Sequence, residues 1–363
     1  MFPKVVSLFS GGGGLDLGFQ AAGYQIIWAS DINQEAVDTY RANVGDHVIC
    51  ADITILPLES IPKADILIGG PPCQSFSLAG KRCAEDARGR LVWSYLNVLK
   101  HVQPKAFVFE NVTGLLSVRR KDGSKVWDSL CKEFAAAGYN VSAQVINAAD
   151  YGVPQMRRRV ILVGLRDGQQ FIFPSPTHAP EATAQLARYV SVREALGDLP
   201  SPMSSPQPVR TNRKKTQGAY GCFVYDAKEV TEHEMPQMSS LDKYIAEHVR
   251  PGGNYRDIPA DVPSKRIRRL QKEGGHTTCY GRLHPNAPAH TINTYFNRPN
   301  VGCNIHYAED RLITVREALR LQSFPDSYRM VTHTKKGKML IVGNAVPPLL
   351  AKAVAEQLKL YIK

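Results

Sequence analysis

Apolar and polar positions in the first half of the chain follow two alternating patterns. Segments with the helical spacing of apolar residues lie at 15–22, 34–43, 91–101 and 127–137. Several of the apolar runs between them are apolar on both faces, which is typical of a parallel sheet covered by helices on each side. The pattern predicts an α/β fold on a mostly parallel sheet with helices on both faces. The expected strands are residues 5–9, 24–30, 47–51, 64–68, 106–109, 141–146 and 160–165.

The regular alternation stops near Pro174. Residues 175–300 are rich in Pro, Gly, Ser and Thr, and they carry basic clusters at Arg213–Lys215 and Lys265–Arg269. This change in composition indicates a second, smaller and more irregular domain. Helical signals return at 314–322 and, with two prolines suited to a first turn, at the C-terminus.

Composition narrows the class of protein. Hydrophobic residues make up 43% of the 363 positions, which excludes wholesale disorder. The formal net charge of +12 favours a polyanionic partner. We expect no membrane span, because no apolar run approaches the ~20 residues that one needs. The N-terminus does not resemble a signal peptide, so we expect the chain to stay in the compartment where it is made.

The seven cysteines are scattered and odd in number, with no CxxC pair. We therefore expect neither a zinc site nor any other metal site, and no disulfide framework. Most of these thiols are expected to be small buried apolar groups. They are Cys50, Cys73, Cys83, Cys131, Cys222, Cys279 and Cys303.

A glycine run, Gly11 to Gly14, joins the first expected strand to the first expected helix. Glycines allow a tight turn and the close approach of a ligand. Asp31 ends the next strand, where a carboxylate can accept hydrogen bonds from ribose hydroxyls, and Asp52 ends the third, where it can meet an adenine amino group. The constellation indicates an adenosine-containing cofactor. The alternative is a tight turn with two exposed aspartates that cap helices.

Two further residues lie at strand ends of the expected sheet. Cys73 follows Gly-Gly-Pro-Pro after one strand, and Glu110 ends the next. The carboxyl edge of an open α/β sheet is where such folds hold their ligands. The alternatives are a buried structural cysteine and a solvated carboxylate.

A thiolate and a carboxylic acid beside an adenosine cofactor indicate a definite reaction. Addition of a thiolate to carbon 6 of cytosine makes carbon 5 nucleophilic. A carboxylic acid with a raised pKa can supply the proton that ring nitrogen 3 then needs. Methyl transfer from a sulfonium and elimination of the thiolate complete the cycle.

Six motifs stand in the order found in one family: FSGGGGLDLGF, GGPPCQSFS, FENV, QMRRRV, RLITVREALRLQSFPD and GNAVPP. The chain resembles the bacterial cytosine-5 DNA methyltransferases nearly from end to end. The resemblance implies a Rossmann-like fold and S-adenosylmethionine as methyl donor. It implies three parts: a catalytic domain at 1–174, a target-recognition domain at 175–305, and a C-terminal segment at 306–363 that returns to the catalytic domain.

The resemblance assigns the cofactor pocket residue by residue. Phe9 would stack on the adenine, Pro72 would line the side facing the target base, and Asn344 and Val346 would border the pocket from the C-terminal segment. The full set of expected cofactor-binding residues is Phe9, Ser10, Gly11, Gly13, Gly14, Leu15, Asp31, Ile32, Asp52, Ile53, Pro72, Asn344, Ala345 and Val346.

The resemblance also assigns the chemistry. Cys73 is the expected nucleophile and Glu110 the expected acid. Arg157 and Arg159 belong to a Q-x-R-x-R pattern that begins at Gln155, and Arg159 would hold the cytosine carbonyl oxygen. The alternative for these arginines is a basic strand edge. A cytosine must leave the duplex before Cys73 can reach it, so base flipping is implied.

Contacts with DNA are expected from two regions. The stretch 74–93 would be a loop that closes over DNA, or else an ordinary charged loop, and residues 175–300 would read the sequence. Arg282 and its neighbours up to Arg298 form the richest cluster of possible readers, although each alone is more often a phosphate or structural group. The expected DNA-binding residues are Gln74, Ser77, Lys81, Arg82, Arg88, Arg90, Gln155, Arg282, Thr291 and Arg298.

We therefore expect a DNA (cytosine-5)-methyltransferase that acts on double-stranded DNA in the bacterial cytoplasm as a monomer. A separately acting cognate restriction endonuclease is an optional partner. Two alternatives stay open: a tRNA cytosine-5 methyltransferase on the same fold, and a DNA-binding regulator without catalysis. The sequence does not name the recognition site.

Overall fold

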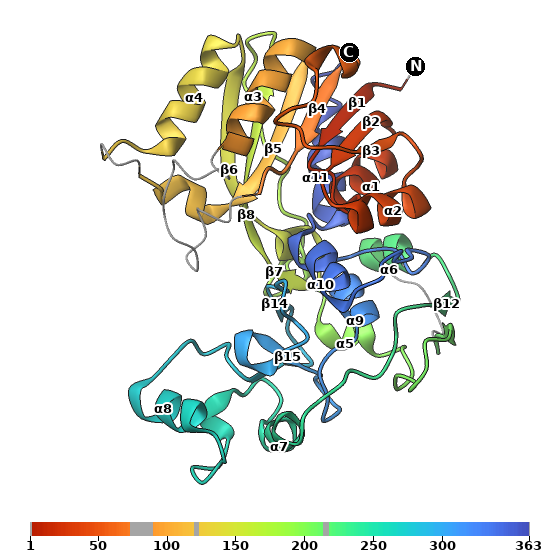
Figure 1. Ribbon diagram of the computed structural model, residues 1–363, viewed down its shortest axis with the longest axis vertical. Helices are drawn as coiled ribbons and strands as arrows, with labels where there is room; N and C mark the ends of the chain where they lie inside the picture. The colour runs from red at the N-terminus through yellow and green to blue at the C-terminus, as the bar shows by residue number, and fades with distance from the viewer. Residues whose placement is uncertain (1, 73–89, 120–122, 213–217, 363) are drawn as a thin grey trace. The chain divides into compact units, whose positions relative to one another are not determined.

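The computed structural model describes residues 2–72, 90–119, 123–212 and 218–362. The chain divides into two compact units (Figure 1). The first unit comprises residues 1–147, 158–175 and 350–363, and the second comprises 148–157 and 176–349. The two units are described separately below.

The first unit contains a seven-stranded sheet in the order β3-β2-β1-β4-β5-β8-β6. Strands β1 to β5 are parallel, whereas β8 runs antiparallel to both β5 and β6. The elements of this unit are β1 (Lys4–Leu8), α1 (Gly14–Ala21), β2 (Gln25–Asp31), α2 (Gln34–Asn43), β3 (Val48–Cys50), η1 (Leu58–Ser60), β4 (Ile66–Gly69), α3 (Arg90–Val102), β5 (Ala106–Val112), η2 (Thr113–Ser117), α4 (Val126–Ala136), β6 (Asn140–Asn147), β8 (Arg158–Leu165) and α11 (Pro348–Leu358).

The strand order reverses between β1 and β4. From β1 the chain builds β2 and β3 on one side, and it then crosses to β4 on the other. The carboxyl ends of the strands at such a reversal diverge and leave a crevice for ligands. The glycine run after β1 and the Gly-Gly-Pro-Pro segment after β4 therefore lie at the position where open α/β sheets bind ligands.

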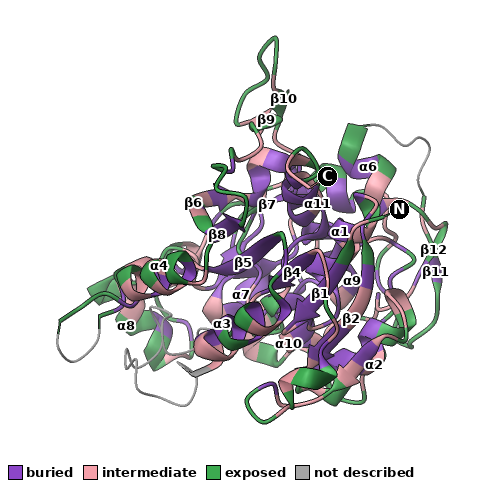
Figure 2. Ribbon diagram, turned by 90° about the horizontal axis from the view of Figure 1, so that it is seen from above, coloured by how far each residue is buried: buried purple, intermediate pink, exposed green. Residues whose placement is uncertain are grey.

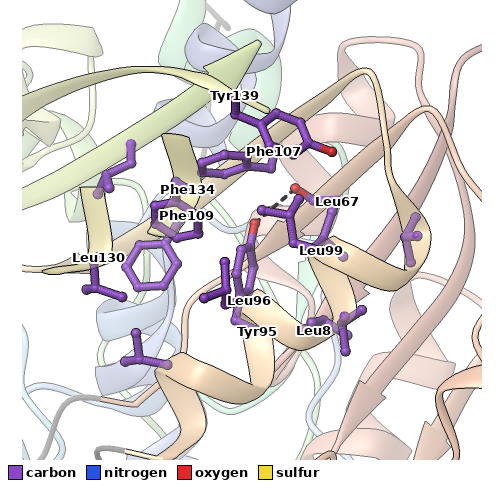
Figure 3. Packing of buried hydrophobic residues seen from close by; sticks show 14 of the residues in the cluster. Leu8, Leu67, Tyr95, Leu96, Leu99, Phe107, Phe109, Leu130, Phe134 and Tyr139 are labelled. Atoms are coloured by element: carbon purple, nitrogen blue, oxygen red, sulfur yellow. Dashed lines mark hydrogen bonds between the residues drawn. The ribbon is translucent and has the colours of Figure 1, made fainter. Parts of the chain in front are cut away.

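Helices cover both faces of this sheet. Helices α3 and α4 lie on one face, and α1 and α11 lie on the other (Figures 1 and 2). The rings of Tyr95, Phe107, Phe109, Phe134 and Tyr139 pack together under α3 and α4 (Figure 3). The Tyr95 hydroxyl lies in this apolar cluster and donates to backbone carbonyl oxygens of β4 and β5. The expected α/β fold, with its mostly parallel sheet covered on both faces, is confirmed.

The second unit consists mostly of short elements. They are η3 (Ala148–Tyr151), β7 (Gln155–Met156), β9 (His178–Ala179), β10 (Ala187–Arg188), α5 (Val192–Leu196), β11 (Val209–Arg210), α6 (Gly218–Val224), β12 (Glu229–Val230), α7 (Ser240–His248), η4 (Tyr255–Asp257), α8 (Lys265–Glu273), β13 (Gly281–Arg282), β14 (Ala289–His290), η5 (Pro299–Val301), β15 (Cys303–Ile305), α9 (Val315–Leu321) and α10 (Lys335–Asn344).

Buried ion pairs organise part of the second unit around α9. Arg311 donates to both carboxylate oxygens of Glu317, at 2.9 and 2.7 Å. Burial alone opposes ionisation of Glu317, but Arg311 outweighs it and lowers the pKa of this carboxyl to about 2. Arg320 pairs with Asp326, and both side chains are fully buried. The motif that begins at Arg311 is therefore part of the core, with its charges paired inside.

Among the described residues, one stretch, Lys335–Leu358, is long and apolar enough to cross a membrane. Its most apolar window is 67% buried inside the protein, and the chain breaks it into α10 and α11. Burial within the fold accounts for its hydropathy.

Candidate functional site

The glycine turn after β1 has an unusual backbone. Phe9 has φ 54°, Gly11 φ 53° and Gly13 φ 86°. The left-handed conformation costs Phe9 about 1–2 kcal/mol, and strain of this kind clusters at functional turns. A Cβ at Gly13 would lie 2.5 Å from Cγ2 of Val44, whereas one at Gly11 would meet nothing within 4 Å. The lack of a side chain at Gly13 therefore allows close packing against Val44, whereas Gly11 borders open space beside the turn.

Asp31 joins this turn to the end of β2. One carboxylate oxygen accepts the Gly11 N–H at 2.8 Å, and the other accepts the Asn33 N–H at 2.9 Å. Burial raises the pKa of Asp31, and these two backbone donors oppose the shift. Each oxygen keeps a lone pair for a further donor, because a carboxylate has about four acceptor sites.

The remaining residues of the expected cofactor pocket in the first unit lie along the same edge. Ser10 is buried and hydrogen-bonded to the Ser30 carbonyl, and Gly14 and Leu15 begin α1. Ile32 is 68% exposed and Ile53 is buried. Asp52 accepts hydrogen bonds from the backbone and hydroxyl of Thr54, which lower its pKa. Pro72 is exposed at the end of the described segment.

Asn344, Ala345 and Val346 belong to the second unit. Asn344 is the last residue of α10 and is exposed, whereas Val346 is buried. The helix expected at the C-terminus begins at Pro348, after Ala345, whose ψ of 146° lies outside the helical region and ends α10.

The Gly-Gly-Pro-Pro segment after β4 is fastened to β5. Asn111 is buried and donates from Nδ2 to the Pro71 carbonyl oxygen at 3.1 Å. A Cβ on Gly70 would lie 2.9 Å from Oε2 of Glu110, so this position accepts only a glycine without rearrangement. The Glu110 carboxylate therefore lies directly against the segment that leads to Cys73.

Glu110 and Arg159 form an ion pair within the first unit. Nε of Arg159 lies 2.9 Å from Oε1 of Glu110, and the two side chains are 13% and 10% exposed. Burial lowers the pKa of the Arg159 guanidinium from its ordinary value, and Glu110 opposes that shift. A shielded, paired guanidinium and carboxylate form a site that can hold a polar planar ligand by hydrogen bonds.

Several expected site residues lie outside the described part of the chain. They include the predicted nucleophile, and the structure gives no position for it relative to Glu110. These residues are Cys73, Gln74, Ser77, Lys81, Arg82 and Arg88. Arg90 begins α3, but its side chain is also outside the description.

Arg157 and Gln155 differ from expectation. Arg157 was expected to be catalytic, but its side chain is fully buried and donates to the carbonyls of Ile292, Gly343 and Ala345 at 2.9–3.0 Å. Gln155 was expected to bind DNA, but it is also fully buried and its amide nitrogen bonds to Leu321 O. Both side chains satisfy backbone and side-chain groups inside the second unit, so neither is available to a substrate here.

Arg282 is also buried. It was expected to contact DNA, yet it is 5% exposed. Its guanidinium donates to the carbonyl oxygens of Val249 and His306 and is paired with Asp310. An arginine on a two-residue strand gives no sequence signal that separates such an internal role from an exposed one.

Thr291 and Arg298 are exposed, as a DNA-binding role requires. The Thr291 hydroxyl donates to the Met156 carbonyl at 2.8 Å. The Arg298 guanidinium lies over the ring of Tyr295, 5.4 Å from its centroid, and Tyr295 is itself 53% exposed. This stacked pair presents a cation and a π-face to solvent.

Sequence reasoning missed two residues that shape the first unit. Asn111 holds the Pro71 carbonyl, and its signal was present, since it belongs to the FENV motif. Asp16 is fully buried in α1, where its carboxylate accepts the Tyr40 hydroxyl at 2.9 Å. Burial raises the pKa of Asp16 to about 6. Asp16 stands within the glycine motif, but nothing in its spacing distinguishes a buried acid.

A surface hollow lies elsewhere on the first unit. Gln103, Lys105, Leu165 and Arg166 line it. Because Leu165 pairs with Ala106 at the start of β5, the hollow is at the amino edge of the parallel strands. It is therefore at the opposite edge from Glu110 and takes no part in the site.

A family model described as C-5 cytosine-specific DNA methylase matches residues 3–360 of the chain. The chain is 37% identical over 351 residues to the type II methyltransferase M.NgoFVII of Neisseria gonorrhoeae, covering 95% of this chain and 83% of that protein. It is 35% identical over 364 residues to the type II methyltransferase M.FnuDI of Fusobacterium nucleatum, covering 98% and 94%.

Solved structures share the fold. A putative DNA modification methyltransferase encoded within an E. coli prophage has a TM-score of 0.75 at 24% identity, covering 98% of each chain. The S. pombe Dnmt2 methyltransferase has a TM-score of 0.62 at 18% identity, covering 99% of this chain and 98% of that one. At these identities the likeness shows a common architecture.

Proposed function

We propose that Cys73, Glu110 and Arg159 carry the chemistry of this chain, which belongs to the C-5 cytosine-specific DNA methylase family and is a DNA cytosine-5 methyltransferase. The observation that carries this proposal is the buried ion pair of Glu110 and Arg159. It lies against Gly70, three residues before Cys73, at the edge of the sheet where the strand order reverses.

The residues of the first unit fit S-adenosylmethionine. Gly11 leaves open space beside a turn with a strained backbone, and the Asp31 carboxylate retains acceptor capacity for ribose hydroxyls. Ile32 offers an exposed apolar side chain next to Asp31, suited to the face of an adenine ring. When bound, the cofactor supplies an electrophilic methyl group on a sulfonium.

Glu110 and Arg159 are proposed to hold the flipped cytosine by its polar edge. The Arg159 guanidinium donates to the carbonyl oxygen at carbon 2. Glu110, which must take up a proton from solvent when the base binds, passes that proton to ring nitrogen 3 as the ring becomes electron-rich. Their mutual contact of 2.9 Å sets both groups side by side before a base arrives. Asn111 is a positioning residue, because it fixes the Pro71 carbonyl and with it the approach to Cys73.

Cys73 is proposed as the nucleophile. Its thiolate forms a bond to carbon 6 of cytosine, and carbon 5 then takes the methyl group. Loss of the carbon 5 proton and cleavage of the carbon–sulfur bond release Cys73 and the methylated base. The cytosine must be turned out of the duplex for this attack.

Residues 175–305 are proposed to read the DNA, with Arg298 and Thr291 at their exposed surface. We further propose that the C-terminal segment 306–363 contributes Asn344 to Val346 to the cofactor pocket. The protein is proposed to act as a cytoplasmic monomer on double-stranded DNA. The type II naming of its relatives supports a separately acting cognate endonuclease.

The test uses the full chain with radiolabelled methyl donor on duplex DNA and, in parallel, on tRNA. Incorporation into duplex DNA alone is expected, and bisulfite sequencing of that DNA then gives the target sequence. Incorporation into tRNA alone would contradict the proposal.

Covalent trapping and kinetics of variants test the proposed roles of Cys73 and Glu110. A target duplex with 5-fluorocytosine should form a covalent adduct with the wild type, because the fluorine cannot leave as a proton does. Cys73→Ser should form none. Glu110→Gln should lower kcat by about 10²–10⁴-fold. The control variant Glu133→Gln removes a carboxylate from the exposed ion pair with Lys100, and it should change neither adduct formation nor kcat.

A further inference from the structure

The basic cluster at Lys265–Arg269 has no part in the proposed chemistry. In the structure it forms the first five residues of α8, Lys265–Glu273. One side of this helix packs against the rest of the second unit. Ile267 is buried there, and Gln271 donates to the carbonyl oxygens of Tyr255 and Ile258. The other side is exposed, and its charged residues are Lys265, Arg266, Arg268, Arg269, Lys272 and Glu273.

The exposed side of α8 carries five cations and one acid. Glu273 pairs with Arg269 at 3.2 Å, and among the described residues this is the ion pair that α8 makes. One of the Arg268 nitrogens donates to the Val262 carbonyl at 2.9 Å. The helix therefore presents a strongly positive surface to solvent.

Apart from Arg269, which pairs with Glu273, and Lys272 in the last turn, this charge does not stabilise the helix. Lys265 and Arg266 stand in the first turn, at the positive end of the helix dipole, and that turn contains no acidic residue. Lys265 and Arg269 are four residues apart, as are Arg268 and Lys272, and such like-charged neighbours cost about 0.2–0.5 kcal/mol each. A polyanion removes both penalties.

The helix adjoins the exposed segment that carries Arg298. Ile267 of α8 and Tyr280 belong to one buried hydrophobic cluster, and the charge of Arg266 opposes the effect of burial, which raises the pKa of the Tyr280 phenol. The backbone N–H of Tyr280 in turn bonds to the Pro299 carbonyl at 2.7 Å, directly after Arg298. The basic helix and the proposed reading segment thus belong to one continuous part of the second unit.

We propose that the exposed face of α8 binds the phosphate backbone of duplex DNA outside the recognition sequence and raises affinity whatever the sequence. Nine helical residues span about 13 Å. A duplex offers one negative charge for every 1.7 Å or so of its axis, so several phosphates fall within reach of one helix face. The inference rests on the proposed role of residues 175–305 in DNA binding, and it adds a contact that carries affinity rather than sequence information.

The test variant combines Lys265→Gln, Arg266→Gln, Arg269→Gln and Lys272→Gln. It leaves Arg268 because of its bond to Val262. The matched control combines four exposed lysines of the first unit, as Lys4→Gln, Lys63→Gln, Lys100→Gln and Lys132→Gln. Each variant lowers the net charge from +12 by four, to +8.

Binding to duplexes with and without the target is measured by fluorescence anisotropy over a range of salt concentrations. The slope of log Kd against log salt should fall by about 3–4 for the α8 variant. The fall should be equal for both duplexes, and the control should keep the wild-type slope. On long duplexes KM for DNA should rise with kcat unchanged. On duplexes trimmed to the recognition site the variant and the wild type should converge.

Three results would overturn the inference: a slope no lower than that of the control, a loss confined to the target duplex, or a lowered melting temperature. The second would make α8 a base reader, and the third would give its charges a structural role. The double variant Lys265→Gln with Arg266→Gln repeats the test with a smaller change, and its slope should fall by about 2. Because anisotropy reports binding alone, a wild type that binds but does not methylate would refute the proposed function and leave this inference standing.

Discussion

Arg159 reaches Glu110 diagonally across two antiparallel strands, with 2.9 Å between Nε and Oε1. Arg159 pairs in register with Val112 on β5, two residues beyond Glu110, so both side chains project from the same face of the sheet. The sheet backbone thus fixes the distance between them.

Substitutions of the two arginines of the Q-x-R-x-R pattern are predicted to have different effects, one on catalysis and one on stability. Arg159→Ala should lower kcat by about 10²–10³-fold, with the melting temperature nearly unchanged, because it removes a donor to the base. Arg157→Ala should lower the free energy of unfolding by about 3 kcal/mol or more, because it leaves the carbonyls of Ile292, Gly343 and Ala345 without their donors. Kinetics and thermal melting of both variants would check this, and a stable but inactive Arg157→Ala would contradict it.

Gly70→Ala is predicted to damage catalysis through Glu110. The new methyl group would lie 2.9 Å from Oε2 of Glu110 and displace the carboxylate. We expect kcat to fall at least tenfold while KM for the methyl donor changes little. Melting curves supply the control: Gly70→Ala should destabilise the wild type more than it destabilises a Glu110→Ala background, where the clashing group is absent. Equal losses in both backgrounds would rule out this mechanism.

Asp16→Asn is predicted to stabilise the protein at pH 8 and to have little effect at pH 4. The folded pKa of Asp16 is raised from 3.8 to about 6 by burial, so its ionisation opposes folding as the pH rises through this interval. Above pH 6 the penalty is on the order of 3 kcal/mol, and an asparagine, which can still accept from Tyr40, avoids it. Melting temperatures from pH 4 to pH 8 test the prediction, and a variant less stable than the wild type at pH 8 would refute it.

Glu317→Gln is predicted to destabilise the second unit by about 3–5 kcal/mol at pH 7, because Arg311 would lose its buried counter-ion. Since the folded pKa of Glu317 is lowered from 4.5 to about 2, its contribution is full above pH 4.5 and is lost as the pH falls toward 2. Glu309→Gln, at a half-exposed partner of the same arginine, should cost far less. Chemical unfolding at pH 7 and pH 3 would measure both, and equal costs for the two variants would be evidence against the pairing.

The sequence predicted the catalytic fold well because its strands and helices are long and regularly patterned. The residues at 34–43, for example, form α2 with the expected bounds, and those at 106–109 form the first four residues of β5. It predicted less of the second unit. There α8 has few apolar residues among its cations, so its charge cluster was visible but its helix was not.

For the candidate site, too, the sequence predicted some features and missed others. The motifs brought Asp31 and Glu110 to one sheet edge, because β2 and β5 are parallel and deliver their carboxyl ends together. Arg159 reaches the same edge because it stands at the start of the antiparallel strand β8. They could not separate Arg157 from Arg159, because residues two apart in a strand would share a face; the sequence does not show that β8 begins only at Arg158 and that Arg157 belongs to the second unit. The sequence also did not show that Arg282 and Gln155 are buried, because a buried arginine or glutamine that bonds to backbone carbonyls looks the same in sequence as an exposed one.

The division of the chain bears on any attempt to exchange target specificity between relatives. Residues 148–157 belong to the second unit, although residues 158–175 of the first unit separate them from the rest of it in the chain. Their strand β7 pairs with β14. A chimaera that transplants 176–349 alone would leave Gln155 and Arg157 behind with foreign partners. Grafts that carry the short upstream peptide along with the main insert are the ones that should yield soluble hybrid enzymes.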